Sequence, residues 1–328
     1  MECRMNLHDN PEMFLELINR TADHFKIPEV YVEKDYWVTR VLLQLSQSEF
    51  REDFIFKGGT ALSKVFGLIQ RFSEDVDLAM FNHRALSGNQ IKKRIRAAEQ
   101  RISAGLTYVE RPGESKGSQF RKVYYEFPRI VDGDFGHASD VILLEINSFT
   151  SPEPFSPMPV ESLIAEFIRK GLIEGGDAVI IRFGLERFAI NVLDIKRTVA
   201  EKILGLVRAS RSEDPQQALS DKIRHIYDLC MIKRDAQYSQ LFYSDELLDM
   251  VDLVKQADRD QFEDAGIWLD QPLHESVLFS QPLETGENIR GVFHGAFSEL
   301  VYDGDLPSDD EVIGVLSSVA DLLKRMHD

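Results

Sequence analysis

The 328-residue sequence predicts an α/β protein of the α+β kind, in which a core with a small mixed β-sheet is followed by a mostly helical C-terminal domain. Three observations predict this class. Apolar residues recur at helical spacing up to residue 45, short apolar runs bounded by turn residues follow up to about residue 150, and helical patterns dominate beyond residue 195. We therefore expect N-terminal helices over 1–50 packed on a core over 51–160, and a helical domain over 161–328.

Each expected element rests on a local pattern. Asn10 and Pro11 suit the start of the first helix. The Pro-rich stretch at 151–159 indicates an extended or turning segment near a domain boundary. In order, the sequence predicts helices over 11–25 and 29–45, a strand over 54–57, a helix over 60–69, a strand over 75–80, a basic helix over 88–105, strands over 119–130 and 139–149, a helix over 161–171, a strand from 188 that becomes a helix near 195, a helix over 220–234, and mostly helix from 244.

Charge is spread unevenly along the chain. The formal net charge is −17, yet residues 242–328 hold 20 Asp and Glu against 5 Lys and Arg, while residues 1–241 are nearly balanced. Because the field over a binding surface depends on local charge, the low overall pI does not exclude a nucleic acid partner. The acidic third is typical either of a solubilising surface or of a docking surface for a basic partner.

The location of the protein is indicated by what the sequence lacks. Cys3 and Cys230 cannot form a disulfide framework, which is typical of a reducing compartment. The N-terminus has no apolar core like that of a signal peptide, and no apolar run reaches the ~18 residues of a membrane span. We expect a cytoplasmic protein without membrane contact.

The stretch FKGGTALSKVFGLIQRFSEDVDLAM, residues 56–80, predicts phosphate binding at its first end. Gly58 and Gly59 have no Cβ, so a ligand can approach their backbone N–H groups closely. They lead into a helix, whose N-terminus favours anions. Thr60 adds a hydroxyl and Lys57 a positive charge, so together the four residues predict a phosphate cradle.

The other end of the same stretch predicts a metal site. Asp75 and Asp77 alternate along a strand, so both carboxylates point to one face of it. Two carboxylates on one face repel each other unless a cation lies between them, and Mg²⁺ or Mn²⁺ binds such oxygens together with substrate phosphates. A phosphate cradle beside a metal pair is what phosphoryl or nucleotidyl transfer requires. The alternative is a tight turn beside two exposed acids.

A third carboxylate is expected from a neighbouring strand. Glu145 lies in the apolar run VILLEINS, where an unpaired Glu is costly to bury, so a metal or a basic partner would explain it. The alternative is an edge strand with Glu145 facing solvent. Further along, Lys202 neighbours an apolar helix stripe, and Asp228 shares a helix face with Arg224, which is typical of a surface ion pair.

The helix over 88–105 carries the clearest basic cluster in the sequence. Such a helix suits either an RNA backbone or a solvated face. Its cationic residues are Lys92, Lys93, Arg94, Arg96 and Arg101.

The motif KGGTALSKVFGLIQRFSEDVDL resembles the signature of the AbiEii/AbiGii toxin family, whose members are nucleotidyltransferase-fold toxins of bacterial toxin–antitoxin and phage-defence (abortive infection) modules. The segments VEKDYWVTRVLLQL, VAEKILGLVRAS and RHIYDLCMI are similar to further motifs of that family. The resemblance implies a nucleotidyltransferase core and a helical domain, with Mg²⁺ and an NTP as substrate. It also implies a cognate antitoxin as partner, and tRNA or another RNA as acceptor.

Carried over by position, the resemblance implies a role for each motif residue. Gly58, Gly59 and Thr60 would hold the triphosphate, with Thr60 in place of a common Ser. Ser73 would contact phosphate or be modified, and Lys202 would neutralise phosphate charge. Asp228 would be the base for the acceptor hydroxyl, although the motif here reads Arg224-His225 where the family often has Arg-Asp. Asp75, Asp77 and Glu145 would bind metal, with Glu145 in place of Asp.

Two other functions fit part of these patterns. A non-catalytic nucleotide- or partner-binding scaffold would retain the fold, but the intact glycine and Asp75–Asp77 set argues against it. A glycosyltransferase also uses an Asp-x-Asp pair with sugar nucleotides, but the Gly-Gly-Thr turn upstream of the pair disfavours it. We therefore expect a metal-dependent nucleotidyltransferase that transfers a nucleotide to an RNA or protein hydroxyl.

Overall fold

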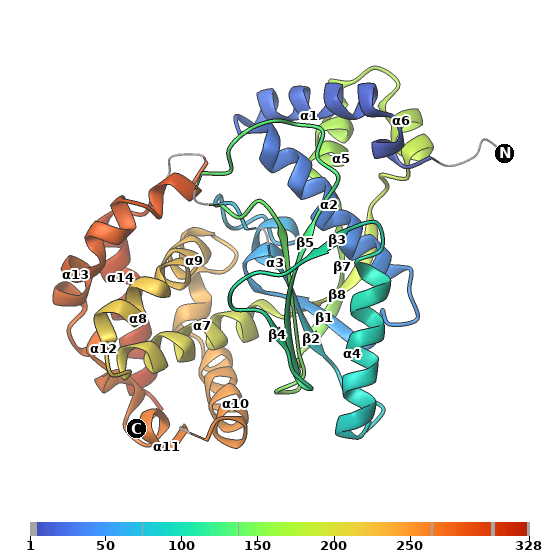
Figure 1. The fold of residues 1–328 in the computed structure, drawn as a ribbon. Coiled ribbons are helices and arrows are strands. Elements are labelled where there is room, and N and C mark those ends of the chain that lie inside the picture. Colours follow the sequence, from blue (N-terminus) through green and yellow to red (C-terminus); the bar gives the residue numbers. More distant parts are fainter. Residues whose placement is uncertain (1–4, 74, 137, 264, 303–305, 327–328) are drawn as a thin grey trace. The chain divides into compact units, whose positions relative to one another are not determined.

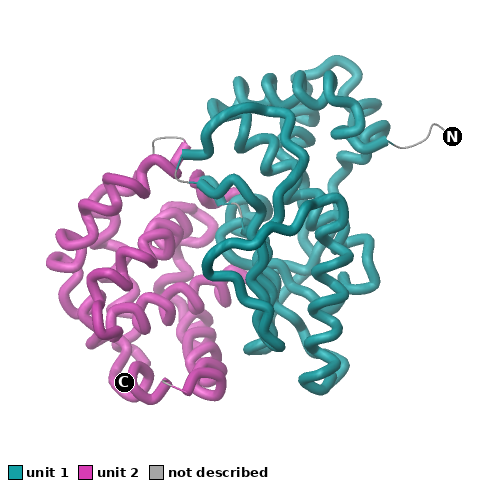
Figure 2. The backbone as a smooth tube through the Cα atoms, in the orientation of Figure 1, with its two compact units in different colours: residues 1–66, 72–192 teal, residues 67–71, 193–328 magenta. Residues whose placement is uncertain are grey.

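The computed structural model describes residues 5–326 apart from 74, 137, 264 and 303–305 (Figure 1). The chain forms two compact units, coloured separately in Figure 2. Unit 1 comprises residues 1–66 and 72–192, and unit 2 comprises residues 67–71 and 193–328. Residues 161–192, which we expected in the helical domain, thus belong to the unit that contains the sheet.

Unit 1 is built on one mixed sheet with the strand order β3-β5-β6-β2-β1-β8-β7, and β4 pairs with β5. The β2–β6 and β1–β8 pairs are parallel, whereas β1–β2 and β5–β6 are antiparallel. This confirms the predicted α+β class with a mixed sheet. The strands are β1 (Phe54–Lys57), β2 (Asp75–Met80), β3 (Thr107–Val109), β4 (Ser115–Lys116), β5 (Phe120–Glu126), β6 (Ile142–Asn147), β7 (Phe155–Val160) and β8 (Phe188–Leu193).

Helices account for the rest of the regular structure. In unit 2, α7 packs against α9 and α10, and α14 packs against α9 and α13. Unit 1 contains α1 (Pro11–Phe25), α2 (Glu29–Ser46), α3 (Gly58–Lys64), α4 (Gly88–Ile102), α5 (Leu163–Phe167) and α6 (Gly176–Phe183); unit 2 contains α7 (Ile195–Ser210), α8 (Pro215–Asp221), α9 (Ile223–Arg234), α10 (Asp245–Gln261), α11 (Ala265–Leu269), α12 (Val277–Ser280), α13 (Pro282–His294) and α14 (Asp309–Lys324).

Some local predictions differ from the structure. Helix α3 ends at Lys64 rather than near residue 69, because Gly67 adopts a left-handed backbone with φ of 64° and the chain then leaves unit 1. The Pro-rich stretch supplies β7, whose two prolines are tolerated at the end of the strand order. Strands β3 and β4 were not expected, since each is only two or three residues long.

Charged residues in the middle of α2 hold a long connection in place. Glu33 and Lys34 are fully buried. The Glu33 carboxylate accepts hydrogen bonds from the backbone N–H groups of Ile130 (2.6 Å) and Val131 (3.3 Å), and Lys34 Nζ donates to the carbonyl oxygen of Ser139 at 2.6 Å. Burial raises the pKa of Glu33, and the two backbone bonds oppose that rise. The segment that leads from β5 to β6 is thus attached to α2 at three points.

The next residue of α2 anchors the helix that follows the glycine turn. Asp35 forms an ion pair with Lys64 at the end of α3, and it also accepts a hydrogen bond from Leu163 N at 2.8 Å. Both side chains of the ion pair are mostly buried, so the pair is screened little by solvent. It fixes the C-terminal end of α3 against α2. None of the described helices combines the length and the apolarity needed to cross a membrane.

Candidate active site

Four charged side chains form one row across the sheet of unit 1. Lys57 is the register partner of Asp77, Asp77 is the partner of Glu145, and Glu145 is the partner of Lys122. Register partners project to the same face of a sheet, and Asp75 shares that face because it precedes Asp77 by two residues. The structure therefore brings three carboxylates together on adjacent strands, with a lysine on either side of the row.

Glu145 lies on an interior strand, because β6 is flanked by β5 and β2. The alternative of an edge strand is therefore wrong. Lys122 Nζ lies 2.9 Å from Glu145 Oε1, and about three tenths of each side chain is exposed. Partial burial lowers the pKa of Lys122, but the hydrogen bond and the charge of Glu145 outweigh it and raise the pKa overall. Lys122 was not predicted as a site residue, since only the β5–β6 register places it here.

Gly58 lies against the carboxylate of Asp77. Its φ is 80°, and a Cβ built on its backbone would be 2.1 Å from Asp77 Oδ2. Glycine is thus required twice, once for the left-handed backbone and once for the close approach. The first residue of α3 and the second carboxylate of β2 are therefore in direct proximity.

The hydroxyl of Thr60 connects α3 to the start of β2. Thr60 is 1% exposed, and its Oγ1 donates to the carbonyl oxygen of Asp75 at 2.5 Å. Ser73 Oγ lies 3.1 Å from Thr60 Oγ1. The structure thus places this hydroxyl beneath the backbone of Asp75, where it fixes the strand that carries the two acids.

The donor set fits a hard divalent cation. Among the described residues, no group of three or more His, Cys, Asp or Glu side chains is arranged to hold a metal. Asp75 and Asp77 nevertheless offer carboxylate oxygens on one face, and Mg²⁺ is commonly held by one or two carboxylates, with phosphates and waters completing its shell. Glu145 pairs with Lys122 here, so it would join such a shell only by exchanging that partner.

Lys202 and Asp228 meet inside unit 2. The Asp228 carboxylate is fully buried and accepts two hydrogen bonds from Arg71, at 2.8 and 2.9 Å, and one from Lys202 Nζ at 2.7 Å. The alternative of a surface ion pair with Arg224 is therefore wrong. Arg71 was not predicted, because it is 157 residues from Asp228 in the sequence and no periodic pattern connects the two.

The electrostatics of this cluster follow from its burial. Burial alone would raise the pKa of Asp228, but the charges of Arg71 and Lys202, and then their hydrogen bonds, hold the pKa well below its usual range. Asp228 is therefore ionised throughout the physiological range. It compensates two buried cations, of which Lys202 has a side chain that is 8% exposed.

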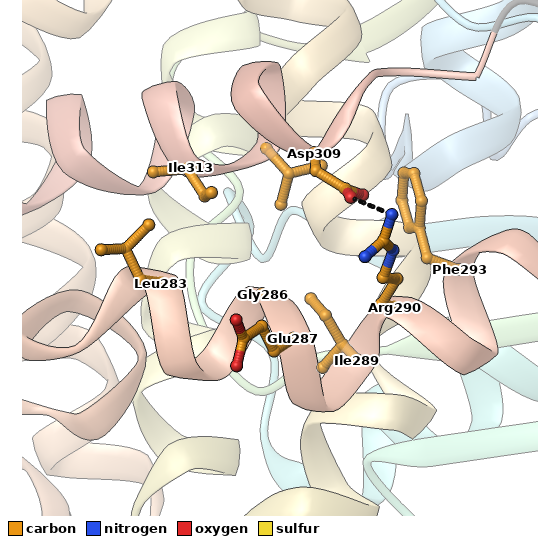
Figure 3. A pocket seen from close by; sticks show the side chains of 9 residues that line it. Leu283, Gly286, Glu287, Ile289, Arg290, Phe293, Asp309 and Ile313 are labelled. Carbon is orange, nitrogen blue, oxygen red and sulfur yellow. Dashed lines mark ion pairs between the residues drawn. The ribbon is translucent and has the colours of Figure 1, made fainter.

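Each unit also has a cavity that none of these residues lines. In unit 2, a cavity of about 140 Å³ lies between α13 and α14, where Arg290 and Asp309 form an ion pair at 3.0 Å (Figure 3). In unit 1, a cavity of about 450 Å³ is lined by Trp37, Arg40 and Arg101, among others. Neither Arg40 nor Arg101 forms an ion pair with another described residue. The larger cavity thus carries uncompensated positive charge.

The basic helix of the sequence is α4, and its exposed face is cationic. Arg94 pairs with Asp53, whereas Lys92, Lys93 and Arg96 are exposed and form no ion pair within the described part of the chain. Arg101 ends the same helix and lines the larger cavity. Uncompensated cations therefore run along α4 as far as that cavity.

Comparison with solved structures assigns the fold. MenT4, a nucleotidyltransferase toxin from Mycobacterium tuberculosis H37Rv, superposes with a TM-score of 0.52 at 17% identity, covering 94% of this chain and 98% of MenT4. A candidate nucleotidyltransferase from H. pylori matches at a TM-score of 0.48 and 13% identity, covering 92% and 97% of the two chains. The superposition on MenT4 shows that the class of protein is one with the nucleotidyltransferase fold.

The family is assigned by sequence. Residues 40–313 match the model of the family described as the nucleotidyl transferase AbiEii toxin of type IV toxin–antitoxin systems. The chain therefore belongs to the AbiEii nucleotidyltransferase toxin family, and it is a nucleotidyltransferase. This confirms the resemblance drawn from the motifs. No curated protein matches the chain.

Replacing Gly58 by alanine should disturb Asp77 as well as the turn. Gly67→Ala is the matched control, because Gly67 has φ of 64° but no atom within 4 Å of an added Cβ. We expect Gly67→Ala to lower the free energy of unfolding by about 1 kcal/mol, from left-handed strain alone. Gly58→Ala should lower it by roughly 2–4 kcal/mol, because the clash with Asp77 Oδ2 is added. Urea unfolding measures the free energy of unfolding of both variants. Equal losses in Gly58→Ala and Gly67→Ala would contradict the close approach of Gly58 to Asp77.

Replacing Asp228 by asparagine should give a pH-dependent loss of stability. At pH 7 the variant leaves Arg71 and Lys202 buried without a compensating charge, so the free energy of unfolding should fall by roughly 3–5 kcal/mol. The folded-state pKa of Asp228 is lower than its unfolded value of about 3.9. The carboxylate therefore stabilises the fold above about pH 4, and this contribution is lost as the pH falls toward the folded pKa.

The gap in stability between wild type and Asp228→Asn should thus be narrower at low pH than at neutral pH. Urea unfolding followed by circular dichroism, at about pH 7 and about pH 3.5, measures the gap. A gap of the same size at both pH values would show that the charge of Asp228 is not what stabilises the cluster.

Proposed function

We propose that this chain is a metal-dependent toxin that transfers a nucleoside monophosphate from an NTP to a hydroxyl group of RNA or protein. One observation carries the proposal: the carboxylates of Asp75, Asp77 and Glu145 lie on one face of the sheet, beside the Gly58 turn. Oxygen donors next to the backbone N–H groups of a glycine turn suit a metal-bound triphosphate. The family supplies the reaction class, and the row of charges supplies the place for it.

The proposed reaction is a displacement at phosphorus. The oxygen of the acceptor hydroxyl forms a bond to the α-phosphorus of the NTP, the bond from that phosphorus to the bridging α–β oxygen breaks, and pyrophosphate leaves with the bonding electrons. The hydroxyl proton passes to solvent or to a nearby base. The chain must therefore hold the triphosphate, orient the acceptor and balance charge.

Each residue near the row has a proposed part. Asp75 and Asp77 would hold Mg²⁺ or Mn²⁺, with Glu145 as a third ligand, and the ion would supply charge neutralisation for the phosphates. Gly58 and Gly59 would present backbone N–H groups to phosphate oxygens. The further residues proposed to contact or position the triphosphate are Lys57, Thr60, Ser73 and Lys122.

Thr60 and Lys122 acquire more specific parts from their contacts. The Thr60 hydroxyl donates to the carbonyl oxygen of Asp75, so its proposed contribution is to position β2, the strand that carries Asp75 and Asp77. Lys122 holds Glu145 at 2.9 Å, and a bound triphosphate would offer that ammonium a second anionic partner. We propose that Lys122 moves from Glu145 to phosphate when the nucleotide binds, which frees Glu145 for the metal.

The acceptor that the surface favours is RNA. The uncompensated cations of α4 suit a phosphate backbone, and the cavity beside Arg101 is within the ~300–1,000 Å³ range of ligand sites. We propose tRNA or another RNA as the acceptor, a cognate antitoxin as the protein partner, and the cytoplasm as the place of action.

Removing both strand carboxylates should abolish transfer without unfolding the protein. We expect Asp75→Ala with Asp77→Ala to lower nucleotide incorporation by roughly 10³-fold or more, since no metal would be held. The control is Asp23→Ala, an exposed acid on α1 with no described ion pair. The assay incubates the protein with each labelled NTP, Mg²⁺ and total RNA.

Two outcomes of that assay would count against the mechanism. Full activity in a folded double variant would refute the role of the two acids. A wild type that labels neither RNA nor protein with any NTP would favour the non-catalytic scaffold instead.

Reversing charges on α4 should weaken RNA binding. If the wild type contacts about four phosphates, the logarithm of its association constant for RNA should fall with log[salt] at a slope of about −3. The double variant Lys93→Glu with Arg96→Glu should make that slope shallower by about 1.4. The control with equal charge change is Lys26→Glu with Arg182→Glu, two exposed cations of which Lys26 follows the end of α1 and Arg182 lies on α6. Fluorescence anisotropy of a labelled single-stranded RNA measures the affinity of both double variants. If the two weaken RNA binding equally, the cations of α4 are not the RNA-binding surface.

A further inference from the structure

The short segment Gly67–Arg71 lies between α3 and β2 in sequence but belongs to unit 2. The backbone of this segment forms hydrogen bonds with two different parts of unit 2. Gln70 N donates to the hydroxyl of Tyr227 on α9 at 3.3 Å, and Tyr302 N donates to Gln70 O at 3.1 Å. Arg71 forms an antiparallel β-bridge with Val301. The segment is thus attached to unit 2 just before the chain returns to the two site acids.

The Arg71 side chain makes the strongest of these attachments. Its guanidinium donates to both oxygens of Asp228 in a bidentate pair, with side-chain exposures of 4% and 0%. Lys202 donates to the same carboxylate from α7. Charge-assisted bidentate pairs are both strong and geometrically specific.

These contacts bear on what Asp228 can do. A general base must come within hydrogen-bond reach of the proton it accepts, directly or through one water. Both Asp228 oxygens already accept bonds from cations, and the residue has no exposed surface. Its depressed pKa also makes it a weak proton acceptor. The carboxylate is arranged to hold cations rather than to exchange a proton.

We propose that Asp228 is the anchor of segment Gly67–Arg71, and through it a positioning residue for Ser73 and Asp75, rather than the base of the transfer reaction. Arg71 precedes Ser73 by two residues and Asp75 by four, so the attachment of Arg71 constrains where the chain re-enters β2. The positioning part rests on the proposed function. The anchor itself does not.

Hydrogen exchange tests the anchor independently of activity. In Asp228→Asn and in Arg71→Gln, amide exchange of the peptide covering residues 67–73 should be at least about 10-fold faster than in wild type. Asp249→Asn, an exposed acid on α10 with no described ion pair, should leave it unchanged. Arg71→Lys keeps the charge and loses the bidentate geometry, so it should give a smaller increase while keeping the protein folded.

Kinetics test the positioning role. Asp228→Asn and Arg71→Gln should each lower kcat/KM for transfer by about 30-fold or more, with an increase in KM for the NTP, because Ser73 and Asp75 are displaced. The double variant should be no worse than the poorer single variant, since both changes remove one interaction. Arg71→Lys should restore part of the activity and leave the pH profile of kcat unchanged.

The outcomes separate the alternatives. If Asp228→Asn loses transfer through kcat alone while exchange over 67–73 stays at the wild-type rate, Asp228 is the base and the proposal is refuted. Unchanged exchange in Arg71→Lys and Arg71→Gln would refute it as well. If the wild type transfers no nucleotide, the proposed function fails, and the exchange rates still decide whether Asp228 is the anchor.

Discussion

The contact on which the site depends is the approach of the Gly58 backbone to the Asp77 carboxylate. Only a residue without Cβ fits there, since an added carbon would be 2.1 Å from Asp77 Oδ2. This contact brings the end of β1 and the start of α3 against β2, and the Thr60 hydroxyl beneath Asp75 fixes the same junction from inside. The charged row then follows from strand register alone, because Asp77 has partners on both sides.

Buried charges hold the elements around this junction. Burying an ion pair is costly, and such pairs are weak evidence for stability, but removing one partner is strongly destabilising. Asp35 fixes the end of α3 through Lys64, and Asp228 fixes segment Gly67–Arg71 through Arg71. In both cases the pair ties down the chain next to the site. We therefore interpret these pairs as determinants of geometry more than of overall stability.

The sequence predicted those parts of the site that local periodicity determines. The shared face of Asp75 and Asp77 follows from strand alternation, and the interior place of Glu145 follows from its apolar run. Lys122 and Arg71 could not be found this way, because the first depends on the β5–β6 register and the second on a partner 157 residues away. The family-level prediction of fold and enzyme class was confirmed, while the role of each site residue stays a prediction.

The charges of the row explain why nucleotide and metal would bind together. Asp75, Asp77 and Glu145 face Lys57 and Lys122, so these five side chains leave an excess of negative charge on the face. A triphosphate adds several more negative charges, and like charges at close range disfavour binding. Lys122 can neutralise either Glu145 or a phosphate, but not both fully. A divalent cation carried in with the nucleotide would resolve this conflict, because it would compensate the phosphates and the strand carboxylates at once.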